Sequence, residues 1–182
     1  MRFALLFVLA LALAPAVSAQ MRASGEARPS PNALVGQTIG TTDVTVTYGR
    51  PSVRGRTVFG PDTTALVPYS QVWRLGANEA TTLTPSKDAR VGGQPLAAGT
   101  YAVFAIPTPT EWTLVFNRVA EQWGAYRYDA AQDALRVTVA PRAFPHTVEM
   151  FEIGFDDVTD TSAAMVLTWD RVRVAVPIQT AG

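Results

Sequence analysis

The chain has 182 residues, with 15 Lys and Arg residues balanced by 15 Asp and Glu residues, one histidine and no cysteine. This balance provides no long-range field to attract nucleic acid or an anionic membrane, so neither is an expected partner. The lack of cysteine excludes thiol catalysis, and His146 alone cannot supply the two or three imidazoles of a usual transition-metal centre, so we expect no metal and no cofactor.

The N-terminus has the pattern of a secretory signal peptide. Arg2 precedes the apolar run "FALLFVLALALA", and "AVSAQ" then places small residues before a cleavage site between Ala19 and Gln20. The run is shorter than the roughly twenty residues that a membrane-spanning helix needs. We expect residues 1–19 to be removed and the mature protein to be secreted or periplasmic, without membrane insertion.

Residues 20–31, "QMRASGEARPSP", have no periodicity, and we interpret them as a flexible lead-in. Beyond them, apolar and polar residues alternate with a period of two, which is typical of half-buried strands. The alternating segments are "DVTVTY", "EWTLVFN", "ALRVTV", "MFEIGF", "MVLTW" and "VRVAV". The segment "TYAVFAIP" is apolar at odd-numbered and even-numbered positions alike, which indicates a central strand that is covered on both faces.

These patterns predict one all-β domain over residues 32–182. Turn signals such as "VGGQP" and "PTPT" separate the strand patterns. Many short strands at this spacing favour an antiparallel β-sandwich, and we expect a jelly-roll-like arrangement of roughly eight to ten strands. Trp112 and Trp169 alternate in step with the apolar residues of their strands, so both should lie on the core-facing side.

The segments that join and follow these strands resemble one bacterial family. "VWRLGANEAT" and "AGTYAVFAIP", together with "WGAYRYD" and "DALRVTV", are similar to the family catalogued as domain of unknown function 2911. The resemblance runs from about Asn32 to Ile178. It implies an exported or envelope-associated bacterial protein, and it carries no established activity, cofactor or catalytic residue.

Polar and charged residues gather in the stretch "VPYSQVWRLGANEATTLT". Trp73, Arg74, Asn78 and Glu79 lie within seven residues of one another, in a chain that is only 16% charged. This connection is long for one without regular secondary structure, which is typical of functional loops.

Two further arginines should reach the same place. Arg50 continues the core-facing parity of the preceding strand and should emerge at the rim of the core, and Arg56 follows in the next connection. If the connections 50–60 and 68–80 share one end of the sandwich, they gather these guanidinium groups near Asn78 and Glu79. Such a group suits a ligand carboxylate or phosphate, whereas the alternative is an internal salt bridge from an arginine to Glu79.

Aromatic residues in "EQWGAYRYD" add a second possibility. Trp123, Tyr126 and Tyr128 are suited to stacking against a sugar or peptide, because flat rings with polar tips can cover a ligand face. The alternative is that these rings fold back and plug the end of the sandwich.

The leading hypothesis is an exported, non-catalytic binding module for a small anionic or carbohydrate ligand. Its ligand-binding residues would be Arg50, Arg56, Trp73, Arg74, Asn78, Glu79, Trp123 and Tyr126. One alternative is a structural or interaction domain of the cell envelope, in which the polar cluster is purely internal. A second is a carboxylate-based hydrolase with Glu79 as its general acid or base.

Overall fold

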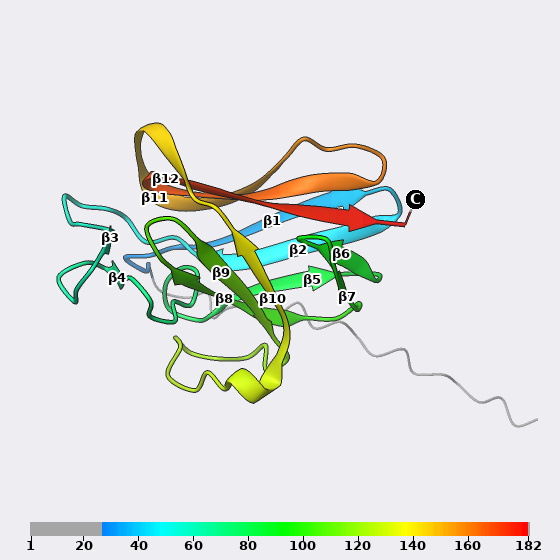
Figure 1. Ribbon diagram of the computed structural model, residues 1–182, viewed down its shortest axis with the longest axis horizontal. Helices are drawn as coiled ribbons and strands as arrows, with labels where there is room; N and C mark the ends of the chain where they lie inside the picture. The colour runs from blue at the N-terminus through cyan, green and yellow to red at the C-terminus, as the bar shows by residue number, and fades with distance from the viewer. Residues whose placement is uncertain (1–26, 182) are drawn as a thin grey trace, which may run out of the picture.

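The computed structural model describes residues 27–181, and the predicted signal peptide lies outside them. The described part is nearly all-β, with a single turn of 3₁₀-helix at Ala130–Gln132 (Figure 1). The larger sheet has six antiparallel strands, in the order β1 (Asn32–Ile39), β2 (Thr42–Gly49), β5 (Thr81–Pro85), β8 (Tyr101–Pro107), β9 (Trp112–Asn117) and β10 (Asp133–Val139).

The second sheet has four antiparallel strands and packs over the first. Their order is β11 (Arg142–Asp156), β12 (Ser162–Thr180), β6 (Ala89–Val91) and β7 (Gln94–Leu96). A third sheet consists of two parallel strands, β3 (Phe59–Gly60) and β4 (Val67–Pro68). The prediction of an antiparallel all-β sandwich is confirmed, whereas the strand order does not confirm a jelly roll.

Alternation places the predicted apolar faces in the core between the sheets. The buried side chains include Val44, Val46 and Tyr48 of β2, Leu114 and Phe116 of β9, Phe151 and Ile153 of β11, and Met165 and Leu167 of β12. The Tyr48 hydroxyl connects the two sheets, because it accepts a hydrogen bond from Ile153 N at 3.0 Å. Strand β8 lies in the middle of the larger sheet and is buried on both faces, as its uninterrupted apolar pattern predicts.

An aromatic cluster closes one end of this core. It contains Phe59, Trp73, Trp112, Phe151 and Trp169, which come from β3, the connection after β4, β9, β11 and β12. The rings of Trp73 and Trp169 are stacked, with 5.7 Å between centroids and 19° between planes, and the other contacts are edge-on. Trp112 and Trp169 are therefore core residues, as predicted.

The long connection between β4 and β5, residues 69–80, is fixed to the larger sheet by its backbone. Trp73 and Ala105 of β8 exchange two backbone hydrogen bonds, each of 2.8 Å, and Ser70 N donates to Pro107 O at 2.8 Å. The Thr81 hydroxyl donates to Leu75 O at 2.6 Å. These bonds satisfy backbone groups that a buried loop would otherwise leave unpaired.

Gly49, the last residue of β2, allows this connection to approach the sheet. A Cβ atom at position 49 would lie 2.2 Å from the carbonyl oxygen of Ala77. Only glycine permits such a contact between two backbones. Gly49 thus allows the second connection, residues 69–80, to lie close to the end of β2, where the first connection, residues 50–58, begins.

We expect Gly49→Ala to lower the free energy of unfolding by about 1–3 kcal/mol, because the added methyl must displace the Ala77 carbonyl. Gly36→Ala in β1 is the matched control, since its Cβ would meet its nearest atoms at an ordinary 3.8 Å. Urea denaturation midpoints check this. Equal midpoints for the two variants would contradict the close approach.

Candidate functional site

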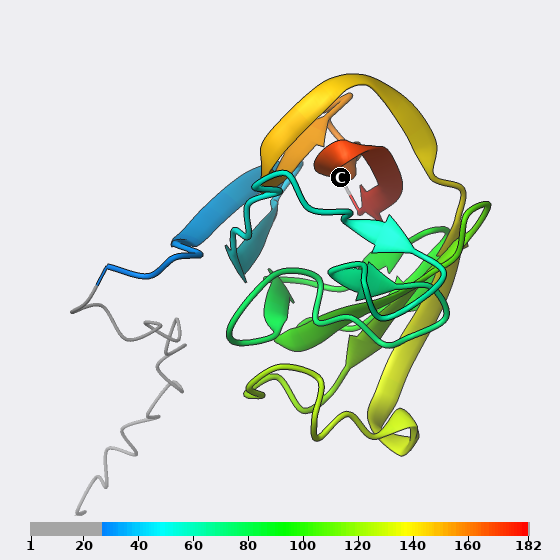
Figure 2. The same cartoon turned by 90° about the vertical axis from the view of Figure 1, so that its left-hand side faces the viewer.

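The two connections meet at the end of the sandwich that carries the aromatic cluster. Figure 2 faces this end and shows the cyan and green loops between the β11–β12 hairpin and the larger sheet. A cavity of about 220 Å³ lies there. Its apolar lining comes from Pro51, Leu66, Val67, Trp73, Ala77 and Trp169, and its polar side chains are Ser30, Arg56 and Arg74.

Two buried hydrogen-bond donors belong to residues that line this cavity. Arg74 Nε and the indole Nε1 of Trp169 have no hydrogen-bond partner among the described residues, although Trp169 is only 2% exposed. The stacked neighbour Trp73 differs, because its Nε1 donates to Gly76 O at 3.0 Å. Buried polar groups are almost always satisfied, so two orphans around one cavity need an explanation.

The cavity has a positive lining. Among residues 27–181, Arg56 and Arg74 both contribute to it, and no carboxylate does. The Arg56 guanidinium is anchored, because its Nε and Nη2 donate to the carbonyl oxygens of Val53 and Ser52 at 3.1 and 2.7 Å. Two arginines in the lining, one of them anchored, favour an anion.

Arg50 lies outside this lining and connects the sheets instead. Its Nε donates to Phe151 O at 2.9 Å, and its Nη2 is 3.9 Å from a carboxylate oxygen of Glu152. Arg50 therefore emerges at the rim of the core as predicted. Its guanidinium faces β11, because the β2 parity directs it there.

Glu79 forms a salt bridge with an arginine that the sequence analysis did not consider. Arg28 Nη1 lies 3.0 and 2.9 Å from the two carboxylate oxygens of Glu79. The alternative of an internal salt bridge from an arginine to Glu79 is therefore present in the structure, and the arginine that forms it is Arg28. Arg28 precedes Glu79 by 51 residues and lies in a segment without periodicity, so no local pattern indicated the contact.

The segment that carries Arg28 lies along the rim of the cavity. Asn78 Nδ2 donates to Ser30 O at 3.1 Å, and Arg50 N donates to Pro31 O at 2.9 Å. Asn78 adopts a φ of 65°, a left-handed conformation that asparagine tolerates better than most residues. Asn78 and Glu79 thus position the chain beside the cavity and are not part of its lining.

Trp123 and Tyr126 lie on the loop between β9 and β10, apart from the cavity lining. Their side chains are 59% and 83% exposed, so these two rings do not fold back as a plug. Tyr128 has the covering role instead, because its ring packs edge-on against Phe104 of β8 at 5.1 Å between centroids. The Trp123 backbone forms an isolated β-bridge with Glu79, which places the loop near the cavity but outside it.

Tyr128 is also part of a polar network that holds this loop. Its hydroxyl donates to Asp133 Oδ2 at 2.8 Å and accepts from Arg136 Nη2 at 2.7 Å. Burial, followed by the hydrogen bond to Asp133, raises the pKa of Tyr128 above the ordinary value of 10.0. The folded protein therefore holds this proton more tightly than the unfolded chain does.

This shift predicts a loss of stability in alkaline solution. The stabilising contribution is fully present below about pH 10 and disappears as the pH rises through the pKa of the folded state. We expect Tyr128→Phe to reduce the slope of unfolding free energy against pH in this range, relative to the parent. Tyr126→Phe is the control, and equal slopes for the parent and Tyr128→Phe would contradict the assignment.

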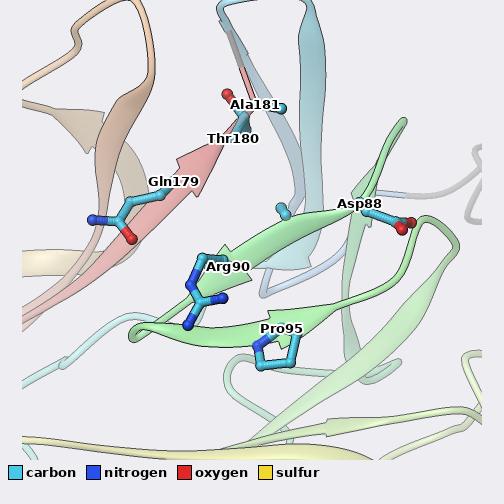
Figure 3. A pocket seen from close by; sticks show the side chains of 7 residues that line it. Asp88, Arg90, Pro95, Gln179, Thr180 and Ala181 are labelled. Atoms are coloured by element: carbon cyan, nitrogen blue, oxygen red, sulfur yellow. The ribbon is translucent and has the colours of Figure 1, made fainter.

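In each of two other hollows, at least one charged side chain is bonded within the chain. The one in Figure 3, of about 420 Å³, lies between β6, β7 and the end of β12, where Arg90 Nη2 donates to Gly93 O and Asp88 accepts from Ala98 N. In the other, of about 520 Å³, Arg173 and Asp156 form an ion pair. Neither has an orphaned buried donor in its lining.

Residues 27–181 contain no group of three His, Asp or Glu side chains arranged to hold a metal ion. Within the same residues, none of the helical structure is long and apolar enough to cross a membrane.

The geometry defines a small all-β domain with a cavity at one end of its core, and Arg56 and Arg74 are among the residues that line it. A family model described as "Protein of unknown function (DUF2911)" matches residues 30–178, so the chain belongs to this family. No curated protein and no solved structure matches the chain.

The two arginines near the cavity differ in a way that stability measurements can detect. We expect Arg28→Ala to lower the free energy of unfolding by about 1–2 kcal/mol, because it removes a partly buried, doubly bonded partner of Glu79. Arg74→Met keeps an apolar stem and removes an unpaired donor, so it should leave stability unchanged or higher.

Chemical denaturation in a buffer without small carboxylates or phosphate compares the two variants. A loss in Arg74→Met as large as that in Arg28→Ala would show that the Arg74 guanidinium has an internal partner.

Proposed function

We propose that the protein is an exported, non-catalytic binding module that holds a small anionic ligand in the cavity beside Trp73 and Trp169. The observation that carries the proposal is the pair of buried donors without partners, Arg74 Nε and Trp169 Nε1, in residues that line one cavity. An unsatisfied buried donor costs about 1–3 kcal/mol, and a ligand acceptor would recover that free energy. The arrangement thus keeps binding groups ready at some expense of stability.

The charge of the site supports an anion over a neutral ligand. Arg56 and Arg74 add two positive charges around a cavity to which no carboxylate of the described residues contributes, although the chain as a whole is balanced. Glu79 is the nearest carboxylate along the second connection, and Arg28 pairs with it.

The same observations weaken the two alternatives. A glycosidase needs two facing carboxylates in a groove, and Glu79 neither lines the cavity nor has a second carboxylate across it. A purely structural cluster would pair Arg74 internally, whereas its Nε is an orphan. A carbohydrate ligand would use the exposed rings of Trp123 and Tyr126, which do not contribute to the cavity.

The proposed location is the periplasm or the outside of the cell. It is supported by the charged residue, apolar run and small-residue cleavage pattern over residues 1–19. A cavity of this size then serves a soluble small molecule that the exported protein meets there.

A panel of small anions tests the function. We expect the melting temperature of the mature protein to rise with acetate, butanoate or phosphate at millimolar concentration, as a ligand that binds only the folded state stabilises it. Calorimetric titration should give an affinity at least about tenfold weaker for Arg74→Met, since a hydrogen bond to a charged group contributes about 1.5–3 kcal/mol.

Arg127→Gln is the matched control, because this exposed arginine does not line the cavity. Binding that is absent, or equal in the parent and Arg74→Met, would contradict the proposal.

A further inference from the structure

We propose that β1 is an interaction surface, along which two copies of the chain pair as an antiparallel dimer with one continuous sheet. This inference goes beyond the anion-binding proposal and does not depend on it, because β1 and the cavity lining share no residue. Figure 2 shows β1, in blue, at the margin of the larger sheet. Its backbone is bonded to β2 on one side, and no strand of the described residues pairs with its other side.

Alternate residues of β1 direct their backbone groups away from β2. The register between the two strands is unbroken, and the two-residue turn that joins them makes Ile39 and Thr42 a hydrogen-bonded pair. At the other end, Arg50 N donates to Pro31 O at 2.9 Å. The odd-numbered residues of β1 therefore bond to β2. The outward N–H and C=O groups belong to the even-numbered residues, Asn32, Leu34, Gly36 and Thr38.

β1 lacks the features by which edge strands usually avoid pairing with another chain. Its sequence, "NALVGQTI", contains no charged residue and no proline, and its register with β2 has no bulge. The three other edge strands of the two main sheets differ. β7 contains Pro95, β10 contains Arg136 and a shift in register, and β11 contains Pro145 and shifts in register. β1 is therefore the edge best suited to accept a further strand.

Two residues of β1 are not explained by contacts within the described part of the chain. The side chain of Leu34 is 65% exposed. Gly36 lies in the interior of the strand, where glycine is less stable than other residues. A Cβ atom at position 36 would meet its nearest atoms at an ordinary 3.8 Å, so no close approach there requires glycine. A partner strand would account for both residues, because a large side chain opposite a glycine can cover the bare backbone.

A second copy of β1 fits this edge in one register. With Leu34 opposite Gly36 of the second copy, Asn32 lies opposite Thr38, and every outward residue has a partner. A two-fold pairing shifted by two residues would leave one of them without a partner in β1. The symmetry also places Val35, which is half-buried in the single chain, opposite its own copy. Because β1 has no charge, this pairing brings no like charges together.

Backbone hydrogen bonds would supply most of the affinity, as they do when a strand is added to the edge of a sheet. Thr38 O contributes less than the others, since it also accepts from Gln37 Nε2 at 2.9 Å. The same surface is used on both copies, so the assembly closes at two chains.

Sedimentation equilibrium of the mature protein over a range of concentrations tests the inference. We expect the average mass to rise from that of one chain toward that of two, and no further. Hydrogen exchange at a low and a high protein concentration locates the contact. The amides of Leu34 and Gly36 should exchange more slowly at the high concentration. The amide of Val35, which is bonded to β2 in either state, should change much less.

Two variants block the edge from its outer side. Gly36→Pro removes an outward N–H and leaves the β1–β2 ladder intact, and Leu34→Lys brings like charges together across the two-fold axis. Each should weaken dimerisation at least about tenfold, because the two-fold repeats each loss. Val119→Lys is the matched control, since it adds the same charge at an exposed apolar residue of the β9–β10 loop. Circular dichroism in dilute solution confirms that each variant is folded.

A parent protein that stays monomeric at every concentration would contradict the inference, and this result does not depend on whether a variant folds. A dimer that Gly36→Pro and Leu34→Lys leave intact would also contradict it, because another surface would then hold the two chains. Protection of the Leu34 and Gly36 amides that is equal at low and high concentration would have the same meaning.

Discussion

The stacking of Trp73 on Trp169 is the contact on which the rest of this structure depends. Trp169 belongs to β12 of the four-stranded sheet, and Trp73 belongs to a connection that is hydrogen-bonded to β8 of the six-stranded sheet. The pair therefore joins both sheets and the longest connection at one point. Aromatic pairs contribute about 0.5–1.5 kcal/mol beyond the area they bury, and Phe59, Trp112 and Phe151 add edge-on contacts around this one. The cavity has rigid walls because its indole surfaces are held by the core.

The arginines near this cavity differ in whether their donors have partners in the chain. Arg28 pairs with Glu79, and Arg56 is anchored to backbone carbonyl oxygens, so both cations have fixed partners. Arg74 has none for its Nε, although it lies only five residues from Glu79 in the sequence. Arg74 and Trp169 both line the cavity, and fixed polar groups of this kind limit the free energy lost on association.

The sequence predicted the sheets well because the period-two alternation is a local property. Val44 and Val46 of β2, and Leu114 and Phe116 of β9, face the core as their parity requires, and the unbroken apolar run of β8 correctly predicted burial on both faces. The position of some loop residues was predicted, whereas ligand binding by them stays a prediction. The two connections do meet, and Arg56, Trp73 and Arg74 line one cavity, as a single cluster near the end of two strands suggested.

What the sequence did not predict depends on contacts between distant segments. The partner of Glu79 is Arg28, whose segment has no pattern that would fix its path across the rim. Trp169 was recognised as a core residue by parity, but parity cannot show whether an indole N–H has a partner, as the contrast with Trp73 demonstrates. Trp123 and Tyr126 sit in a loop whose covering residue is Tyr128, two positions after Tyr126, and no periodicity distinguishes the three.

The most direct test of the central claim is the chemical shift of the Trp169 indole proton. The chain has four tryptophans, so a ¹H–¹⁵N spectrum should contain four indole signals, and Trp169→Phe identifies the one from Trp169. A titration with butanoate should move this signal downfield as its N–H gains an acceptor, while the Trp73 signal, already bonded to Gly76 O, shifts much less. An unchanged Trp169 signal at a saturating butanoate concentration, or a shift of the same size in Arg74→Met, would contradict the account.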